Sequence, residues 1–97
     1  MAFSYSDKNF TVIGNLCFVH IVLDGTESMI DIPPAIVDRM LYSQIFCTYP
    51  YLSSKEARGS GTATMAIGYA IIAYGKISLS DVGVGYLYFY FPIDSNK

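Results

Sequence analysis

Residues 86–91 read Tyr-Leu-Tyr-Phe-Tyr-Phe, and this alternation constrains the fold more than any other feature of the chain. Successive side chains of a β-strand point to opposite faces, so Leu87, Phe89 and Phe91 would share one face and the tyrosines the other. Phenylalanine suits a core, whereas tyrosine suits a surface that is apolar in its body and wet at its hydroxyl. We therefore expect a strand with a core on one side and a second apolar surface on the other.

The rest of the chain also predicts strands, because short runs of β-branched and aromatic residues are bounded by turn residues. We expect strands over residues 10–13, 16–23, 29–32, 43–49, 62–67, 69–79 and 86–91. About seven short strands, with turns roughly every 8 to 12 residues, indicate an all-β fold, a small antiparallel β-sandwich or a barrel-like variant. The 97 residues show no internal repeat and no linker, so a single domain over residues 1–97 is expected.

Glycine, proline and asparagine mark the predicted ends of these strands. Gly14-Asn15 predicts a turn, and Asp24-Gly25 between two apolar runs is among the stronger hairpin signals. Pro33-Pro34 ends a strand, because proline cannot donate to a ladder. Residues 35–42 could form one short helical turn or an extended loop, and residues 80–85 are expected to form a flexible turn.

Residues 69–79 alternate in a way that we interpret as one continuous strand. On that interpretation, Ile71 and Ile77 lie on one face, and Ile72 and Lys76 lie on the other, which becomes more polar toward its end. We therefore expect a strand that leaves the core at its carboxyl end.

Charged residues make up 14% of the chain, against about 25% in an average soluble domain, and hydrophobic residues make up 53%. A monomer could cover itself with Ser, Thr and Tyr, or sister subunits could cover part of its surface. We favour the second interpretation, since a charge-poor, aromatic-rich surface is typical of a subunit interface. The candidate interface consists of Tyr86, Tyr88, Tyr90 and His20, and this histidine interrupts the apolar run of residues 16–23.

The charge balance argues against nucleic acid as a partner. The net charge is −2, and the six Lys and Arg residues are scattered, whereas nucleic-acid binding depends on a basic surface that neutralises phosphates. Membrane insertion is not expected, because glycines interrupt the uncharged stretch of residues 59–75. Residues 1–8 lack the basic start and apolar core of a signal peptide.

No set of side chains forms a recognisable catalytic or cofactor-binding motif, so we expect a non-catalytic protein without a cofactor. His20 is the single histidine, and nothing in the sequence places an acid and a nucleophile beside it. Asp24, Glu27 and Asp31 cluster near one turn, but the spacing of a calcium-binding loop is absent. We therefore expect a solvated turn and no metal site.

The two cysteines, Cys17 and Cys47, each lie inside an apolar run and form no CxxC pair. Buried free thiols are the expectation for such positions. A disulfide between neighbouring strands is the alternative.

One group of residues is a candidate for ligand binding. Tyr49 and Tyr51 stand beside the charged segment of residues 53–60, which contains Lys55 and Arg58. Aromatic faces stack on sugar rings, and charged side chains hydrogen-bond sugar hydroxyls. We therefore name Tyr49, Tyr51, Lys55 and Arg58 as a candidate saccharide site, with ordinary loop packing of the two tyrosines as the alternative.

Several strand ends and turns resemble those of C-terminal head domains in bacteriophage tail fibres and baseplate receptor-binding proteins. Residues 11–19, TVIGNLCFV, resemble the x-V-x-G-N-L-V-x-V opening strand of that family. Its Gly-Thr turn, I-x-L-P strand end, G-x-A-x-I-x-x-x-G-x-I-x-L hairpin and Tyr-Pro-like last strand have counterparts at Gly25-Thr26, Ile30-Asp31-Ile32-Pro33, residues 68–79 and Tyr90-Phe91-Pro92. Residues 35–49 depart from the pattern, because they are more apolar than the usual loop.

This resemblance implies a β-sandwich that assembles as a homotrimer, belongs to the virion beside other virion proteins, and binds a saccharide on the surface of the host cell. The departure in the middle of the chain means that no ligand contacts carry over from the family. A second hypothesis is a structural virion protein, such as a capsid decoration (cement) protein or a collar protein, with no glycan binding.

Overall fold

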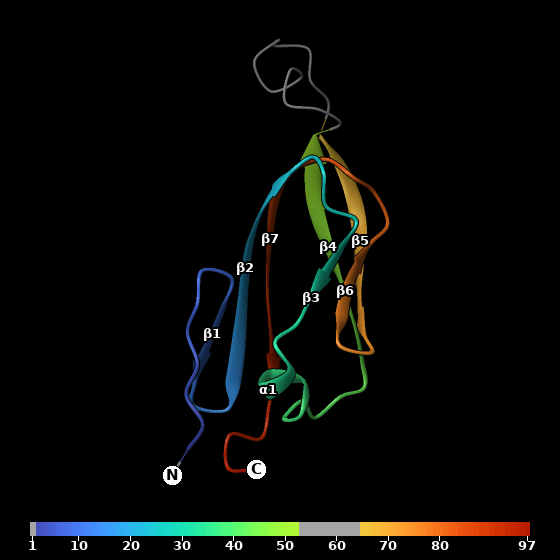
Figure 1. Cartoon of the computed structure of the whole chain (residues 1–97). Coiled ribbons are helices and arrows are strands. Elements are labelled where there is room, and N and C mark those ends of the chain that lie inside the picture. Colours follow the sequence, from blue (N-terminus) through green and yellow to red (C-terminus); the bar gives the residue numbers. More distant parts are fainter. Residues whose placement is uncertain (1, 53–64) are drawn as a thin grey trace.

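The computed structural model describes residues 2–52 and 65–97 of the chain (Figure 1). Within them, seven strands form one antiparallel sheet in the order β1-β2-β7-β4-β5-β6-β3. The elements are β1 (Phe10–Ile13), β2 (Leu16–Asp24), β3 (Met29–Asp31), α1 (Pro34–Val37), β4 (Gln44–Leu52), β5 (Ala66–Ala73), β6 (Lys76–Leu79) and β7 (Val84–Pro92). The prediction of a small all-β fold with one short helical turn is confirmed.

The sheet divides into two layers at Pro50. β4 and β7 pair only where Tyr51 meets Gly85 and Leu52 meets Val84. The carbonyl oxygen of Pro50 faces β7, since a Cβ built on Gly85 would lie 2.5 Å from it. A residue in this orientation extends an antiparallel ladder with its N–H, which proline lacks. β4 and β7 therefore diverge beyond this point (Figure 1), and β1-β2-β7 packs against β4-β5-β6-β3 as a sandwich.

Close backbone approach, rather than flexibility, explains the glycines of residues 80–85. Val84 and Gly85 already belong to β7, so the predicted turn is too long at its carboxyl end. A Cβ on Gly83 would lie 2.4 Å from Cδ2 of Tyr51. The absence of side chains here lets β7 meet β4 at the junction of the two layers.

The core lies between the layers and follows the alternation along each strand. In β2, alternate residues from Cys17 to Leu23 are buried. In β7, Leu87 and Phe91 are buried and Phe89 is half-buried, while the three tyrosines are exposed, which confirms the predicted segregation. The other buried apolar side chains are Phe10, Val12, Ile32, Ile36, Tyr49, Ala70, Ile72, Ile77, Val84 and Ile93.

The prediction of one strand over residues 69–79 is wrong, because the chain reverses at Tyr74 and Gly75. Both residues have positive φ, 55° and 77°, as a type I′ two-residue hairpin requires. The reversal pairs Ile72 with Ile77, and both are fully buried. The side chain of Ile71, predicted to share a face with Ile77, therefore points outward.

The Asp24-Gly25 signal marks a turn but not a hairpin. β2 pairs with β1 and β7, whereas β3 pairs with β6 in the other layer, so this turn crosses between layers. Oδ1 of Asp24 accepts hydrogen bonds from the backbone N–H and the hydroxyl of Thr26, at 3.0 and 2.6 Å. Oε1 of Glu27 accepts one from the backbone N–H of Asp24 at 3.0 Å. Local side-chain bonds thus stabilise the turn without specifying which strand β3 joins.

The two ends of the chain meet at the end of the sandwich where α1 lies (Figure 1). The side-chain oxygen of Asn15, in the turn between β1 and β2, accepts a hydrogen bond from the buried hydroxyl of Ser95 at 2.7 Å. The backbone N–H of Phe3 donates to the carbonyl of Ser95 at 2.6 Å. The guanidinium of Arg39 lies 3.8 Å from the centre of the Phe3 ring. These contacts anchor both termini to one end of the fold.

Candidate functional site

Outward side chains of β2 and β7 form one continuous aromatic surface, which we call the tyrosine face. The register of the two strands places Tyr90, Tyr88 and Tyr86 opposite Phe18, His20 and Val22. All six side chains are exposed, and Tyr88 retains 59% of its accessible surface. The tyrosine face consists of Phe18, His20, Val22, Tyr86, Tyr88 and Tyr90.

Ring contacts hold the tyrosine face together. The ring centres of His20 and Tyr88 lie 4.5 Å apart, and those of Phe18 and Tyr90 lie 5.6 Å apart. Tyr86 and Tyr88 stack along β7 at 5.7 Å with an interplanar angle of 13°. Cross-strand aromatic pairs of this kind stabilise a sheet and reduce the freedom of each ring. The rings therefore present a preformed surface.

A hollow of about 500 Å³ lies on the tyrosine face between the His20–Tyr88 pair and the Phe18–Tyr90 pair. The backbones of β2 and β7 form its floor at Val19 and Phe89. Among the outward positions of the two strands, only Asp24 at the end of β2 carries a charged side chain, while Lys8 and Glu27 line a neighbouring hollow with His20 and Val22. An aromatic surface depleted of charge has the composition of an interface centre.

The opposite layer carries a second apolar surface, which we call the back face. Its outward side chains pair across β4 and β5, with Phe46 opposite Ile71, and Thr48 opposite Tyr69. Tyr69 retains 63% of its accessible surface. The large exposed residues of the back face are Met29, Phe46, Ile67, Tyr69 and Ile71.

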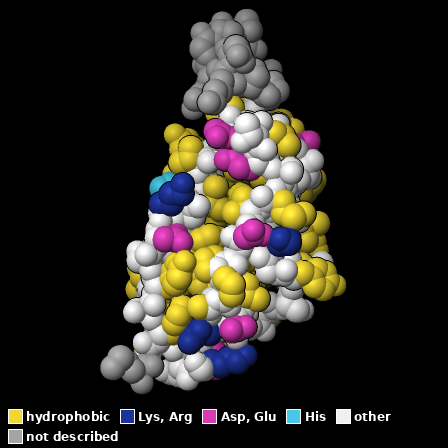
Figure 2. All heavy atoms as spheres, in the orientation of Figure 1, with side chains coloured by type: hydrophobic (Ala, Val, Ile, Leu, Met, Phe, Trp, Pro, Cys, Tyr) yellow, Lys and Arg dark blue, Asp and Glu magenta, His cyan; other side chains and the backbone are white. Residues whose placement is uncertain are grey.

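The back face is also poor in charge. Among the outward positions of β3, β4, β5 and β6, charge is confined to one ion pair at the end, Lys76 with Asp31, at 2.6 Å. Figure 2 shows one side of the molecule, where apolar side chains spread over the surface and charged side chains lie in small groups between them. Sequence reasoning missed this surface, because the Tyr74–Gly75 hairpin decides that Tyr69 and Ile71 point outward.

Tyr49 is a core residue, which corrects its assignment to a saccharide site. The side chain is 1% exposed, and its ring lies over Gly68, where an added Cβ would be 2.5 Å from Cζ of the ring. The hydroxyl donates to the carbonyl of Asp81 at 2.6 Å and accepts from the N–H of the same residue at 3.1 Å. The hydroxyl of Tyr49 thus holds the loop before β7, and its ring offers no face to a ligand.

Of the other members of that candidate saccharide site, Tyr51 is the one that the structure describes. Tyr51 is half-buried, with its ring centre 5.9 Å from that of Tyr49, and burial and the neighbouring Asp81 carboxylate raise the pKa of Tyr51. Lys55 and Arg58 lie outside the residues that the structure describes.

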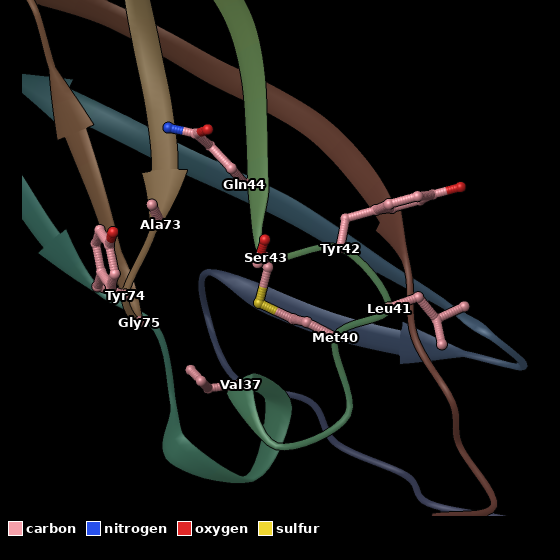
Figure 3. A pocket seen from close by; sticks show the side chains of 9 residues that line it. All are labelled: Val37, Met40, Leu41, Tyr42, Ser43, Gln44, Ala73, Tyr74 and Gly75. Atoms are coloured by element: carbon pink, nitrogen blue, oxygen red, sulfur yellow. The ribbon is translucent and has the colours of Figure 1, made fainter.

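A different hollow lies at the tip of the β5–β6 hairpin (Figure 3). Tyr74 stands on one side of it and Tyr42 on the loop opposite, with Val37 and Met40 between them. Tyr74 is 98% exposed and has a positive φ of 55°, a conformation that bulky residues rarely adopt. The lining of this hollow contains no charged side chain. Its other members are Leu41, Ser43, Gln44, Ala73 and Gly75.

The carboxylates near the β2–β3 turn have structural partners. Asp24 and Glu27 accept backbone hydrogen bonds within the turn, and Asp31 pairs with Lys76. In the part of the chain that the structure describes, no group of three or more His, Cys, Asp or Glu side chains is placed to hold a metal ion.

Both cysteines are free thiols, so the alternative of a disulfide is wrong. Cys17 is buried, as predicted, whereas Cys47 is half-buried. Burial, together with the negative charge of Asp7, raises the pKa of Cys17 to about 11. Since the thiolate is the reactive form, Cys17 is unreactive at neutral pH.

Comparisons with known protein families, curated proteins and solved structures found no match to this chain. Among the described residues, no helix is long and apolar enough to cross a membrane. The geometry of the tyrosine face, the back face and the hollow beside Tyr74 is therefore the basis for a functional proposal.

Proposed function

We propose that this protein is a non-catalytic binding module that works as a homo-oligomer, with the tyrosine face as a subunit interface. One observation carries the proposal: the tyrosine face is a preformed, charge-poor aromatic surface on the solvent side of a sheet. Antiparallel sheets usually expose polar side chains on the side that faces water. The aromatic side chains on this side therefore support the proposal that another subunit covers it.

The exposed area of the tyrosine face supports this role. An aromatic side chain buries roughly 150–250 Å², so four rings that are about half exposed offer on the order of 400 Å². This is about half of the roughly 800 Å² that each partner contributes to a standard interface. Val22, His20 and the flanking strands supply further area. The rigid rings also reduce the entropy cost of association.

The experiment that tests this proposal compares two tyrosine variants. Tyr88→Asp places a charge at the centre of the tyrosine face, whereas Tyr74→Asp makes the same change at an exposed hairpin tip. Size-exclusion chromatography with light scattering should give an oligomer for the wild type and Tyr74→Asp, and a monomer for Tyr88→Asp. A monomeric wild type, or an intact Tyr88→Asp oligomer, would contradict the proposed interface.

We further propose that the module is the receptor-binding head domain of a phage tail fibre or baseplate protein, present on the virion as a homotrimer. Support comes from the turn positions of the resemblance: Gly14-Asn15 joins β1 to β2, Pro33 follows the end of β3, and residues 68–79 contain a hairpin. Its partner would be a saccharide on the host surface. Binding of the labelled protein to host cells, with competition by cell-wall saccharide, tests this role.

The hollow beside Tyr74 is the described region that best suits a neutral sugar ring. Tyr74 offers an exposed aromatic face, and Gln44 and Ser43 offer an amide and a hydroxyl without a net charge. Tyr74→Ala should abolish binding in a glycan array while the oligomer remains intact. Retained glycan binding by this variant would place the saccharide site elsewhere, and an oligomer with no affinity for any glycan would contradict the adhesive role.

A second candidate function is that of a structural virion protein, such as a capsid decoration or collar protein. The back face favours it, because a protein embedded in a lattice needs contacts on two sides. Finding the chain in the virion in a stoichiometric ratio to the capsid protein, without glycan binding, would select this function.

A further inference from the structure

We infer that the subunits associate front to back, with the tyrosine face of one copy packed on the back face of the next. This inference rests on the proposed function, since it specifies what the tyrosine face meets in the oligomer. It assigns a role to the back face, which is equally apolar and lies on the other layer of the same sandwich.

The back face needs a cover for the same physical reason as the tyrosine face. Phe46, Ile67 and Tyr69 are each more than half exposed, although they lie on the regular strands β4 and β5. The nearby charges, those of Lys76 and Asp31, neutralise each other at one end. Exposure of such an apolar surface to water is unfavourable in free energy. Association with another copy would bury the surface and remove this unfavourable contribution.

Symmetry decides between the two ways of covering these surfaces with copies of one chain. In an isologous dimer, the tyrosine face would meet itself and the back face would remain in water. In a heterologous assembly, every copy contributes its tyrosine face to one junction and its back face to the next. The second arrangement covers both apolar surfaces without another kind of partner.

The area is sufficient for such a junction. Each face offers on the order of 400 Å² of apolar side chain, so one junction with its flanking strands would bury about 1,000 Å² in total. That is about the smallest buried area expected of a biological interface, and stable ones usually bury about 1,200–2,000 Å². A heterologous junction closes into a ring, such as the proposed trimer, when the two faces are inclined to each other, and it continues as an open stack when they lie on directly opposite sides.

The polar groups of the two faces also complement each other. The tyrosine hydroxyls need hydrogen-bond partners when their rings are buried. The back face supplies the hydroxyl of Thr48 at an exposed outward position of β4. Its projecting rings, Phe46 and Tyr69, are of a size to enter the hollow of about 500 Å³ on the tyrosine face.

The test uses two matched variants, Tyr88→Asp on the tyrosine face and Tyr69→Asp on the back face, with Tyr74→Asp as the control. Each of the first two should be monomeric alone, because each lacks one half of every junction. Mixed in equal amounts, they should form a heterodimer of twice the mass of one chain. The Tyr88→Asp chain supplies an intact back face, and the Tyr69→Asp chain supplies an intact tyrosine face.

Three results would overturn this inference, and they separate it from the proposed function. If Tyr69→Asp keeps the wild-type mass while Tyr88→Asp is monomeric, the back face is not part of the junction, so the front-to-back arrangement fails while the tyrosine face remains a subunit interface. If both aspartate variants are monomeric and folded by circular dichroism, yet their mixture gives no heterodimer, the front-to-back arrangement also fails. If Tyr88→Asp keeps the wild-type mass, both proposals fail. The milder pair Tyr88→Ser and Tyr69→Ser repeats the test should either aspartate variant unfold.

Discussion

The two sides of β7 carry large side chains of similar kind in opposite surroundings. On the inner side, Leu87 and Phe91 pack against the other layer and lose contact with water. On the outer side, Tyr86, Tyr88 and Tyr90 contact each other and β2 but stay about half exposed. The inner side therefore folds the chain, whereas the outer side is available for assembly.

β5 repeats this division in the other layer. Its inner residues Ala70 and Ile72 are fully buried, and its outer residues Tyr69 and Ile71 are exposed. Most antiparallel sheets show apolar residues inside and polar residues outside. In this molecule both layers are apolar on both sides, so substitutions on the inner and outer sides should affect different properties.

The largest effect is expected from truncation of an inner side chain. Leu87→Ala should lower the free energy of unfolding by about 2–5 kcal/mol, because it removes buried methyl groups and leaves a cavity. Tyr90→Ala, on the outer side of the same strand, should change it by less than about 1 kcal/mol. Urea denaturation in the monomeric Tyr88→Asp background measures both without a contribution from assembly. Equal losses would show that the outer side also stabilises the fold.

A smaller effect is expected at the junction of the layers. Gly85→Ala should cost about 1–3 kcal/mol, because its Cβ would lie 2.5 Å from the backbone oxygen of Pro50. The added methyl group should push the paired ends of β4 and β7 apart. The amide protons of Leu52 and Val84 should therefore exchange faster with solvent. Unchanged stability and exchange rates would show that β4 and β7 do not need this close approach.

Two tyrosine-to-phenylalanine changes compare a buried hydroxyl with an exposed one. Tyr49→Phe should cost about 1–2 kcal/mol, because the backbone N–H and carbonyl of Asp81 both lose their partner. Tyr88→Phe should change the stability of the monomer by less than about 0.5 kcal/mol, because its hydroxyl is on the exposed side. Thermal unfolding of the two variants checks this difference. A larger loss of stability for Tyr88→Phe than for Tyr49→Phe would show that the hydroxyl of Tyr88, and not that of Tyr49, stabilises the fold.

A separate prediction concerns the pH dependence of stability. The pKa of Cys17 is raised from 9.0 to about 11 in the fold. The folded chain therefore holds this proton more tightly, and the resulting stability is present below pH 9 and is lost as the pH rises through about 11. Between pH 8 and pH 11, stability should fall more in the wild type than in Cys17→Ala. Parallel losses in both proteins would show that Cys17 contributes nothing to this dependence.

Local alternation allowed much of this architecture to be predicted from the sequence. The division of β7 into Leu and Phe against Tyr, and the strand and turn at residues 10–23, depend on neighbouring residues alone. The outward position of Tyr86, Tyr88 and Tyr90 was predicted for the same reason. Their role as an interface stays a prediction.

Features that depend on distant residues could not be predicted in this way. The Tyr74–Gly75 reversal lacks the usual Asn-Gly signal, and its positive φ at a tyrosine contradicts local preference. Tyr49 looks like a loop aromatic in sequence, but its surroundings come from Gly68 and Asp81. The back face could not be predicted from local alternation, because strand pairing decides which side of the sheet each residue of β5 faces.

Native mass spectrometry of the wild-type chain at micromolar concentration tests the central claim most directly. The claim is that a second copy covers the outer aromatic side of β2 and β7. The expected result is a species of three times the chain mass of 10.7 kDa, replaced by the monomer in Tyr88→Asp. A wild-type chain that stays monomeric at micromolar concentration would contradict the claim.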